Sequence, residues 1–296
     1  MYRTDKTDKS NKSDKNDSDI LNEHEILRRI KNLNLDYDVI YKKSTDSTNS
    51  DAKKYAGERN LLIAAGEQTA GKGRYGRNFS SQSGKGIYFS LKINNPATED
   101  LTFFPLIAAV AASNAISSLC GIEPAVKWPN DLLYKLPPSH ADDTPLKEGG
   151  MDGYKKLCGI LTEASVSAEP ESRNASYVIV GIGLNVGNDI SDFPDEIKNT
   201  ATSLKIISGR QYNRADILCE TASEFTRILY IPRNQLLEEY KKRLLTDIDI
   251  SFKQNGRQFK GRAAGITDGG NLIAKLESGG ETVIRSGEIN FIHNQD

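Results

Sequence analysis

The sequence predicts an α+β fold, with a larger mixed-sheet domain and flanking helices followed by a small all-β domain. Up to residue 246, strand-like and helix-like segments alternate irregularly, which disfavours a regular parallel sheet. From residue 247 to 296, short strands are broken by Asn-Gly, Gly-Gly and Ser-Gly, which is typical of a small β-barrel. Residues 1–22 are almost entirely polar or charged, which predicts a disordered tail. The larger domain is therefore expected at 23–246.

Hydrophobic spacing predicts the elements of the larger domain in order. Ile26, Ile30 and Leu33 share one face of a helix at 25–33. Further helices are predicted at 47–56, 103–121, 213–230 and 234–245, and strands at 37–44, 60–68, 86–93, 156–165 and 176–186, with a strand–turn–strand unit at 125–134. The strand at 176–186 is apolar on both faces and should be central. The polar segment 135–154, which has Pro and Gly but no period, predicts a long loop.

Composition narrows the classes of function. The formal net charge is −1, which disfavours a general nucleic-acid binder. Cys120, Cys158 and Cys219 are far apart in apolar contexts, so they fit neither a disulfide framework nor a metal centre. The sequence shows neither a secretory signal nor an apolar segment long enough for a bilayer. We therefore expect a cytoplasmic protein with no membrane partner and no protein-bound metal.

Residues 71–79, GKGRYGRNF, match two phosphate-loop patterns by spelling, but neither pattern has the context it needs. A dinucleotide fingerprint and a P-loop both open a helix, whereas a polar stretch and then a strand follow here. The glycines still allow backbone N–H groups to close on an anion, and Lys72, Arg74 and Arg77 add positive charge. The sequence predicts a flexible loop that orders over a nucleotide phosphate or a mixed anhydride. A solvated basic surface turn is the alternative.

Three other segments carry chemistry in the same part of the chain. Residues 127–131, KWPND, bring a cation, an indole and a carboxylate to one turn. Lys156 lies at the mouth of an apolar strand, and Gly181 and Gly183 lie in the central strand, where a ligand can approach closely. Each segment also has a plainer interpretation: Trp128 as core, Lys156 as a surface charge, and the glycines as a packing device.

Six motifs in this order make the chain resemble a biotin–protein ligase, of the form that lacks an N-terminal DNA-binding domain. They are STDSTNSDA, GEQTAGKGRYGRNF, KWPNDLLY, KLCGILTEA, VGIGLNV and ATSL, and they span about residues 44–204. The small domain also resembles the SH3-like C-terminal domain of that family. The resemblance implies that biotin and MgATP give biotinyl-5′-AMP and pyrophosphate, and that the biotinyl group then passes to one lysine of a carboxylase carrier domain.

The resemblance also implies roles for the residues that match the motifs. Lys156, Arg74 and Asp131 would be catalytic, with Asp131 binding or deprotonating the acceptor amine or, alternatively, capping the turn beside it. Biotin and biotinyl-AMP would contact Ser47, Thr48, Asn49, Gln68, Gly71, Lys72, Gly73, Arg74, Lys156, Gly159, Gly181, Gly183 and Asn185. The nucleotide would contact Arg77, Lys127, Trp128 and Asn130, although Trp128 is expected to act more by packing.

Two residues depart from the family pattern. Lys72 stands where the family usually has Arg, and Phe79 stands where it usually has Trp. Lysine keeps the charge but loses the bidentate fork, so the loop is expected to close less tightly.

Several alternatives stay open from the sequence. A lipoate–protein ligase shares the adenylation logic, and a non-catalytic biotin or nucleotide sensor could use the same pocket. A DNA-binding role is not expected, because the residues before Glu25 have no apolar period and one helix cannot form a helix-turn-helix. The identity of the carrier protein, and whether the chain forms a homodimer, are left open.

Overall fold

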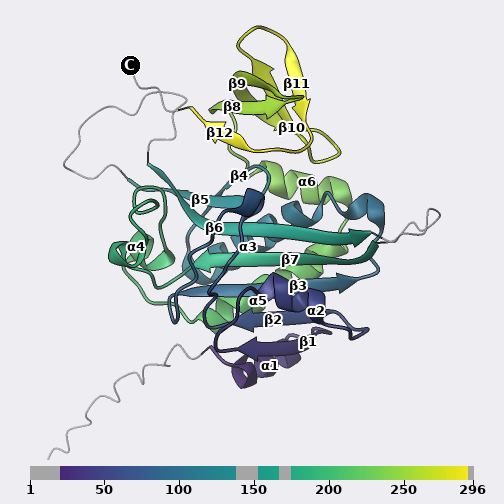
Figure 1. Cartoon of the computed structure of the whole chain (residues 1–296), viewed down its shortest axis with the longest axis vertical. Coiled ribbons are helices and arrows are strands. Elements are labelled where there is room, and N and C mark those ends of the chain that lie inside the picture. Colours follow the sequence, from purple (N-terminus) through teal and green to yellow (C-terminus); the bar gives the residue numbers. More distant parts are fainter. Residues whose placement is uncertain (1–20, 138–152, 167–174, 293–296) are drawn as a thin grey trace, which may run out of the picture.

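The described residues form a large α+β domain and a small β domain (Figure 1). The computed structural model describes residues 21–137, 153–166 and 175–292. The predicted tail therefore lies outside the described residues except for Leu21 and Asn22, as does most of the predicted loop at 135–154. The fold class predicted from the sequence is confirmed.

The larger domain is built on one seven-stranded sheet with the order β1-β2-β3-β7-β6-β5-β4. The strands are β1 Asp38–Lys42, β2 Leu61–Ala65, β3 Gly86–Asn94, β4 Ala125–Lys127, β5 Asp131–Lys135, β6 Tyr154–Val166 and β7 Ala175–Asn185. β1 and β2 are parallel, and the other neighbouring strands are antiparallel. The strand predicted to be central, β7, is the middle strand of the sheet, because its apolar residues are covered on both faces.

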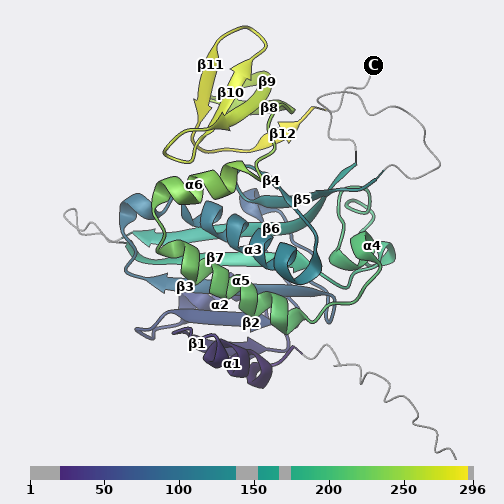
Figure 2. The same ribbon diagram turned by 180° about the vertical axis from the view of Figure 1, so that it is seen from behind.

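Helices α3, α5 and α6 cover one face of this sheet (Figure 2). They span Phe104–Cys120, Arg214–Leu229 and Arg233–Lys241. α3 has Pro105 in its first turn and ends at Gly121, whose φ of 66° is left-handed, as the sequence predicts. Its fully buried side chains, such as Val110 and Ile116, pack against the sheet. Each large apolar side chain buried in this way contributes about 1.5–3 kcal/mol.

The opposite face of the sheet is covered less completely. The short helix α2, Thr48–Lys54, lies over β2, β3 and β7 (Figure 1). Another short helix, α4, spans Leu204–Ser208. The sequence analysis missed α4, because five residues between a Ser203 cap and Gly209 are too few to show a helical period. This incompletely covered face is where the functional site is found.

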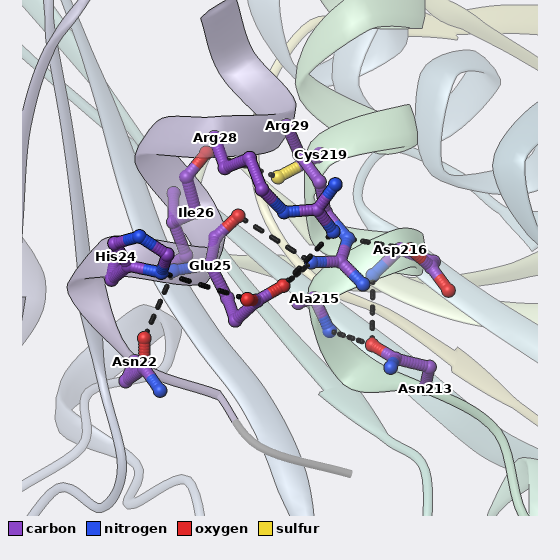
Figure 3. Close-up of polar contacts among 10 residues, drawn as sticks. All are labelled: Asn22, His24, Glu25, Ile26, Arg28, Arg29, Asn213, Ala215, Asp216 and Cys219. Atoms are coloured by element: carbon purple, nitrogen blue, oxygen red, sulfur yellow. Dashed lines mark hydrogen bonds and ion pairs between the residues drawn. The ribbon is translucent and has the colours of Figure 1, made fainter. Parts of the chain in front are cut away.

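Helix α1, Glu23–Asn32, is joined to α5 by a cluster of charges (Figure 3). Arg29 Nε donates to Asp216 Oδ1 over 2.6 Å, and its Nη1 also pairs with Glu25. Asn213 caps α5 by accepting hydrogen bonds from the first-turn backbone, which places Asp216 beside α1. Ile26 and Ile30 are buried beneath these charges. We call this cluster of Glu25, Arg29 and Asp216 the α1–α5 joint.

The small domain is a five-stranded antiparallel sheet with the order β11-β10-β9-β8-β12. Its strands are β8 Asp249–Gln254, β9 Arg257–Ile266, β10 Leu272–Leu276, β11 Glu281–Ile284 and β12 Ile289–Phe291. It is anchored to the larger domain by Trp128, whose Nε1 donates to the carbonyl of Gly270 over 2.9 Å. That hydrogen bond lets the indole be buried without an unpaired N–H. The small domain is consequently fixed beside the KWPND turn.

Candidate active site

A cavity of about 280 Å³ lies on the less covered face of the sheet. Its walls come from the start of α2, the loop at residues 71–79 (the glycine loop), the KWPND turn, β6, β7 and the β11–β12 turn of the small domain. Every site residue predicted from the sequence is in the described part of the chain and lines this cavity, except Gly71. The sequence motifs therefore converge on one place.

Uncharged polar groups occupy the end of the cavity next to α2. Gln68 Oε1 accepts hydrogen bonds from Thr48 N at 2.9 Å and Thr48 Oγ1 at 3.1 Å. Ser90 Oγ, fully buried on β3, lies within hydrogen-bonding distance of Thr48 Oγ1 and donates to Asn49 Oδ1. Ser47 precedes α2, but its hydroxyl does not cap the helix. This network fixes the side chains that offer donors and acceptors to a ligand with an uncharged polar group.

Phe79 lies across a pair of glycines in the floor of the cavity. Gly159 on β6 and Gly183 on β7 are register partners. A Cβ at Gly183 would come within 2.6 Å of the Phe79 ring, and one at Gly159 within 3.2 Å. The glycines are needed here because their missing side chains let an aromatic ring lie on the sheet.

Two other predicted glycines act through their neighbours. A Cβ at Gly181 would lie 2.2 Å from Asn49 Oδ1, so glycine lets Asn49 lie against β7. A Cβ at Gly71 would lie 2.5 Å from the Phe79 carbonyl and 3.0 Å from Gln68 Nε2. Gly71 therefore does not line the cavity but allows the residues that do so to approach one another.

The glycine loop folds back on itself above the cavity. Phe79 N donates to Gly71 O over 2.8 Å, and Gly73 N donates to Arg77 O over 2.7 Å. At the tip, Tyr75 has a left-handed φ of 57° and is exposed. A strand and not an α-helix follows, which agrees with the rejection of both phosphate-loop patterns from the sequence.

Lys156 and Asp131 face each other on neighbouring strands. Lys156 Nζ lies 2.8 Å from Asp131 Oδ1. The Lys156 side chain also extends across Gly159, since a Cβ there would lie 3.2 Å from Nζ. The lysine is thus paired with a carboxylate that also lines the cavity. An anionic ligand can compete for this ammonium group.

Arg74 reaches from the glycine loop to the KWPND turn. Its Nη1 donates to Asn130 Oδ1 over 3.2 Å. Asn130 is itself held by β6, because its Nδ2 donates to the Ile160 carbonyl and its own carbonyl accepts from Ile160 N. The turn therefore positions the guanidinium of Arg74 at the cavity.

Lys127 begins the same turn and is partly buried beside the small domain. Burial lowers the pKa of its ammonium group from the usual 10.5, and the nearby Asp131 carboxylate opposes this effect. Its Nζ lies 4.4 Å from the centroid of the Phe291 ring. Trp128, by contrast, is 4% exposed and lines the cavity wall.

Two groups of lining residues were not predicted from the sequence. One is an apolar lobe after β7, formed by Phe193, Ile197, Thr200 and Ala201. This segment is held to β6, because Lys156 N donates to Thr200 O over 2.7 Å. The other group is Glu288 and Ile289 in the small domain. No predicted site residue falls in either group, although Ala201 of the first group begins the ATSL motif.

Three further features bear on the class of site. Among the described residues, no group of three His, Cys, Asp or Glu side chains is arranged to hold a metal ion. Across the same residues, no helix combines the length and apolarity needed to cross a bilayer. Cys158 and Cys219 are buried and unpaired, and burial raises the pKa of each thiol to about 12. The two thiols therefore act as small apolar groups.

Comparison with known proteins gives the family. Residues 39–185 match the biotin/lipoate A/B protein ligase family, and residues 249–291 match the biotin protein ligase C-terminal domain. The bifunctional ligase/repressor BirA of Bacillus spizizenii is 34% identical over 88% of this chain and 76% of its own length. The biotin–[acetyl-CoA-carboxylase] ligase of Mycobacterium tuberculosis is 30% identical over 82% of this chain and 84% of its own length.

A solved structure agrees with these sequence matches. The biotin protein ligase of Aquifex aeolicus in complex with biotin and ATP has a TM-score of 0.68 and 26% identity, and covers 87% of this chain and 99% of its own. Fold and site therefore define a cofactor–protein ligase. The chain belongs to the biotin protein ligase family, and the ligase predicted from the sequence is confirmed.

Proposed function

We propose that this chain joins biotin to ATP as biotinyl-5′-AMP, and then transfers the biotinyl group to a lysine of a carboxylase carrier domain. One observation carries the proposal. A single cavity has uncharged polar groups beside α2, while Arg74, Arg77, Lys127 and Lys156 line it further along and Lys72 Nζ lies 3.3 Å from Ser50 Oγ of α2. Such a cavity matches a ligand with an uncharged polar ring at one end and a phosphate at the other.

The ureido group of biotin would lie at the uncharged end. Ser47, Thr48 and Gln68 supply hydroxyl and amide groups there, and the buried Ser90 holds Thr48 and Asn49 in place. The apolar body of biotin would lie against the Phe79 ring and the glycine floor. Binding would then place the valeryl carboxylate toward Lys156.

In the first step the biotin carboxylate attacks the α-phosphate of ATP, and pyrophosphate leaves. Both reacting groups are anionic, so their approach is repulsive unless cations lie between them. Lys156 and Arg74 line that part of the cavity, with Lys72 on the loop above. They would stabilise the charge that develops in the transition state, and positioning would supply much of the remaining rate.

In the second step a neutral lysine amine of the carrier attacks the acyl carbon, AMP leaves, and an amide forms as the amine loses a proton. Asp131 is proposed to bind or deprotonate this amine. Its ion-pair partner is Lys156, whose Nζ lies 2.8 Å from Asp131 Oδ1. When Lys156 turns to the phosphate, the Asp131 carboxylate is released for the amine. The same pair would thus serve both steps in sequence.

The adenosine part would occupy the apolar lobe. Phe193 and Ile197 offer apolar surface there, and Thr200 is fixed through its hydrogen bond to Lys156. Lys127 and Asn130 lie on the opposite wall and would face the phosphates. Mg²⁺ is proposed to arrive as the ATP complex, with phosphate oxygens and water as its main ligands.

The remaining parts of the proposal concern the setting. A cytoplasmic location would supply ATP and keep the cysteines reduced. Of the two activities in the name of the Bacillus relative, only the ligase is proposed for this chain, with no nucleic-acid partner. We also propose that the chain can form a homodimer. Analytical ultracentrifugation with and without biotinyl-AMP would decide the oligomeric state.

The lipoate ligase and sensor alternatives are not favoured, because the relatives are biotin ligases and the small domain matches their C-terminal domain. The deciding experiment is mass spectrometry of a biotin carrier domain incubated with this chain, biotin and MgATP. We expect one added biotinyl group on one lysine. An unmodified carrier, or modification when lipoate replaces biotin, would contradict the proposal. A biotin-dependent pyrophosphate burst without transfer would instead support a sensor.

A further inference from the structure

The glycine loop does not contact only its own domain; it is also bound to the β11–β12 turn of the small domain. Arg77 Nη2 lies 2.5 Å from Glu288 Oε1. Arg74 Nη2 donates to the carbonyl of Gly287 over 3.0 Å. Both contacts cross from residues 74–77 to residues 287–288, and both lie at the rim of the cavity.

The positive charges of the two loop arginines, Arg74 and Arg77, have different partners. The contacts of Arg74 in the described structure are with neutral oxygens, namely Asn130 Oδ1, Gly287 O and Tyr75 Oη. Its positive charge is thus held in place without a carboxylate to neutralise it. Arg77 meets the carboxylate of Glu288 directly. The charge of Arg74 is consequently left for a ligand, whereas that of Arg77 is matched within the protein.

The small domain offers Glu288 from a firm support. Ile289, the next residue, is 3% exposed and begins β12. Gly287 has a φ of 117°, a left-handed conformation that favours glycine and shapes the turn. The hydrogen bond from Trp128 to Gly270 fixes the same domain to the cavity wall. A loop bound to Glu288 is therefore bound to the wall of the site.

We propose that Glu288 is a positioning residue, whose ion pair with Arg77 latches the glycine loop over the cavity and slows the escape of the bound acyl-adenylate. This inference rests on the proposed function. It assigns Arg77 to the latch and not to direct contact with the nucleotide phosphate. Arg74 is then the loop arginine that meets the phosphate.

The latch is expected to be weak and reversible. Arg77 is 66% exposed and Glu288 28% exposed, and exposed ion pairs contribute little because water and salt screen them. Loss of the pair should speed release of biotinyl-AMP about two- to fivefold, and the effect should shrink at high salt. A weak latch also suits a loop that must open in every turnover for the carrier lysine.

The test is a charge exchange between the two partners. The variants are Glu288→Arg, Arg77→Glu and the double variant, made in the full chain, with Glu277→Arg as a control on an exposed turn of the same domain. The release rate of biotinyl-AMP is measured by chasing the preloaded complex with unlabelled ligand, and KM for biotin and ATP is measured alongside. We expect both single variants to release faster, the double variant to return toward the parent rate, and Glu277→Arg to match the parent.

Two results would overturn the latch. If Glu288→Arg releases biotinyl-AMP at the parent rate, no latch exists. If Arg77→Glu raises KM for ATP and the double variant does not restore it, Arg77 binds phosphate directly. If the pair had a merely structural role, exchanging the two charges would not restore the release rate of biotinyl-AMP while KM for biotin stays unchanged.

If the parent chain shows no biotin-dependent ATP–pyrophosphate exchange, the proposed function fails. A second measurement still tests the latch in that case. Hydrogen exchange of residues 71–79 in the ligand-free chain should be faster in Glu288→Gln than in the parent, because the loop opens more often. Equal exchange in the two proteins would refute the latch whatever the ligand is.

Discussion

The α1–α5 joint and the rim of the cavity are both built around arginines, but their charges are balanced in opposite ways. At the joint, Arg29 lies between Asp216 and Glu25 (Figure 3). Among the described residues that line the cavity, five cations, Lys72, Arg74, Arg77, Lys127 and Lys156, stand against two carboxylates, Asp131 and Glu288. Charges balance within the first cluster, whereas cations outnumber carboxylates in the second, which suits an anionic ligand.

The protonation equilibria show the same contrast. Burial acts to lower the pKa of the Arg29 guanidinium, but hydrogen bonds to Asp216 and Glu25 outweigh burial and raise it. At the cavity, burial lowers the pKa of Lys127 and the nearby carboxylates do not reverse the effect. A cation that the protein leaves under-compensated is therefore a better sign of function than a cluster of cations as such.

The largest expected effect is at Lys156, where the contrast can be broken most directly. Lys156→Ala should slow biotinyl-AMP formation about 100- to 1000-fold, because a cation at the reacting phosphate is lost. Biotin-dependent ATP–pyrophosphate exchange measures this step. Lys205→Ala is the matched control, since Lys205 pairs with Asp189 over 2.6 Å outside the cavity lining. Both lysines are paired with a carboxylate, so similar losses in the two variants would show that the place of Lys156 in the cavity is not what matters for catalysis.

Arg74 should give the next largest effect. Arg74→Ala should release biotinyl-AMP about 10- to 100-fold faster, because a charge-assisted hydrogen bond to the ligand contributes about 1.5–3 kcal/mol. Pulse–chase release of the labelled intermediate gives the rate. Arg262→Ala, which removes an arginine paired with Asp249 in the small domain, is the control. Unchanged retention in Arg74→Ala would remove the glycine loop from ligand binding.

At the joint, the expected effect is on stability and not on activity. Arg29→Ala breaks a half-exposed pair and should cost about 1 kcal/mol, which lowers the melting temperature of a chain of this size by about 2–4 °C. Thermal denaturation followed by circular dichroism measures the shift. Adenylate synthesis should stay at the parent level. A large loss of activity with an unchanged melting temperature would mean that the joint is not merely structural.

The smallest effect concerns pH and Lys127. Because burial lowers its pKa below 10.5, Lys127 loses its proton at a lower pH than an ordinary lysine. Burial of the charged Lys127 side chain destabilises the folded chain at a pH below the lowered pKa. This destabilisation disappears as the pH rises toward the pKa that lysine has in the unfolded chain. The affinity for ATP, unlike the stability, should fall as the pH rises through the lowered pKa of Lys127.

Lys127→Arg provides the control for this pH effect, since arginine stays charged. The stabilisation by ATP, measured as a shift in melting temperature, should shrink at alkaline pH in the parent and less so in Lys127→Arg. The same decline in both proteins would show that titration of Lys127 does not control ATP binding.

Much of the site could be predicted because its signals are local. The glycine loop, the KWPND turn and the Gly-x-Gly of β7 each need special backbone or charge chemistry within a few residues, so each is visible in the sequence. Strand β7 was placed at the centre of the sheet because its residues are apolar on both faces. Nearly all the residues marked in this way meet at one cavity.

The parts that could not be predicted depend on contacts between distant segments. Ser90 looks like an ordinary polar position of an alternating strand, and only the packing of α2 makes it fully buried and functional. Glu288 is one of many acidic residues until the small domain is seen against the cavity. Phe193 and Ile197 form an apolar lobe on a segment that has neither helical nor strand period.

The residues that line the cavity are far apart in the sequence, and this affects when the site can form during synthesis of the chain. Its lining begins at Ser47 and ends at Ile289. A ribosome must therefore deliver the chain as far as Ile289 before these walls can meet. A nascent chain that already exposes Lys156 still lacks the turn that holds Arg77, so an unfinished product cannot close over a labile anhydride.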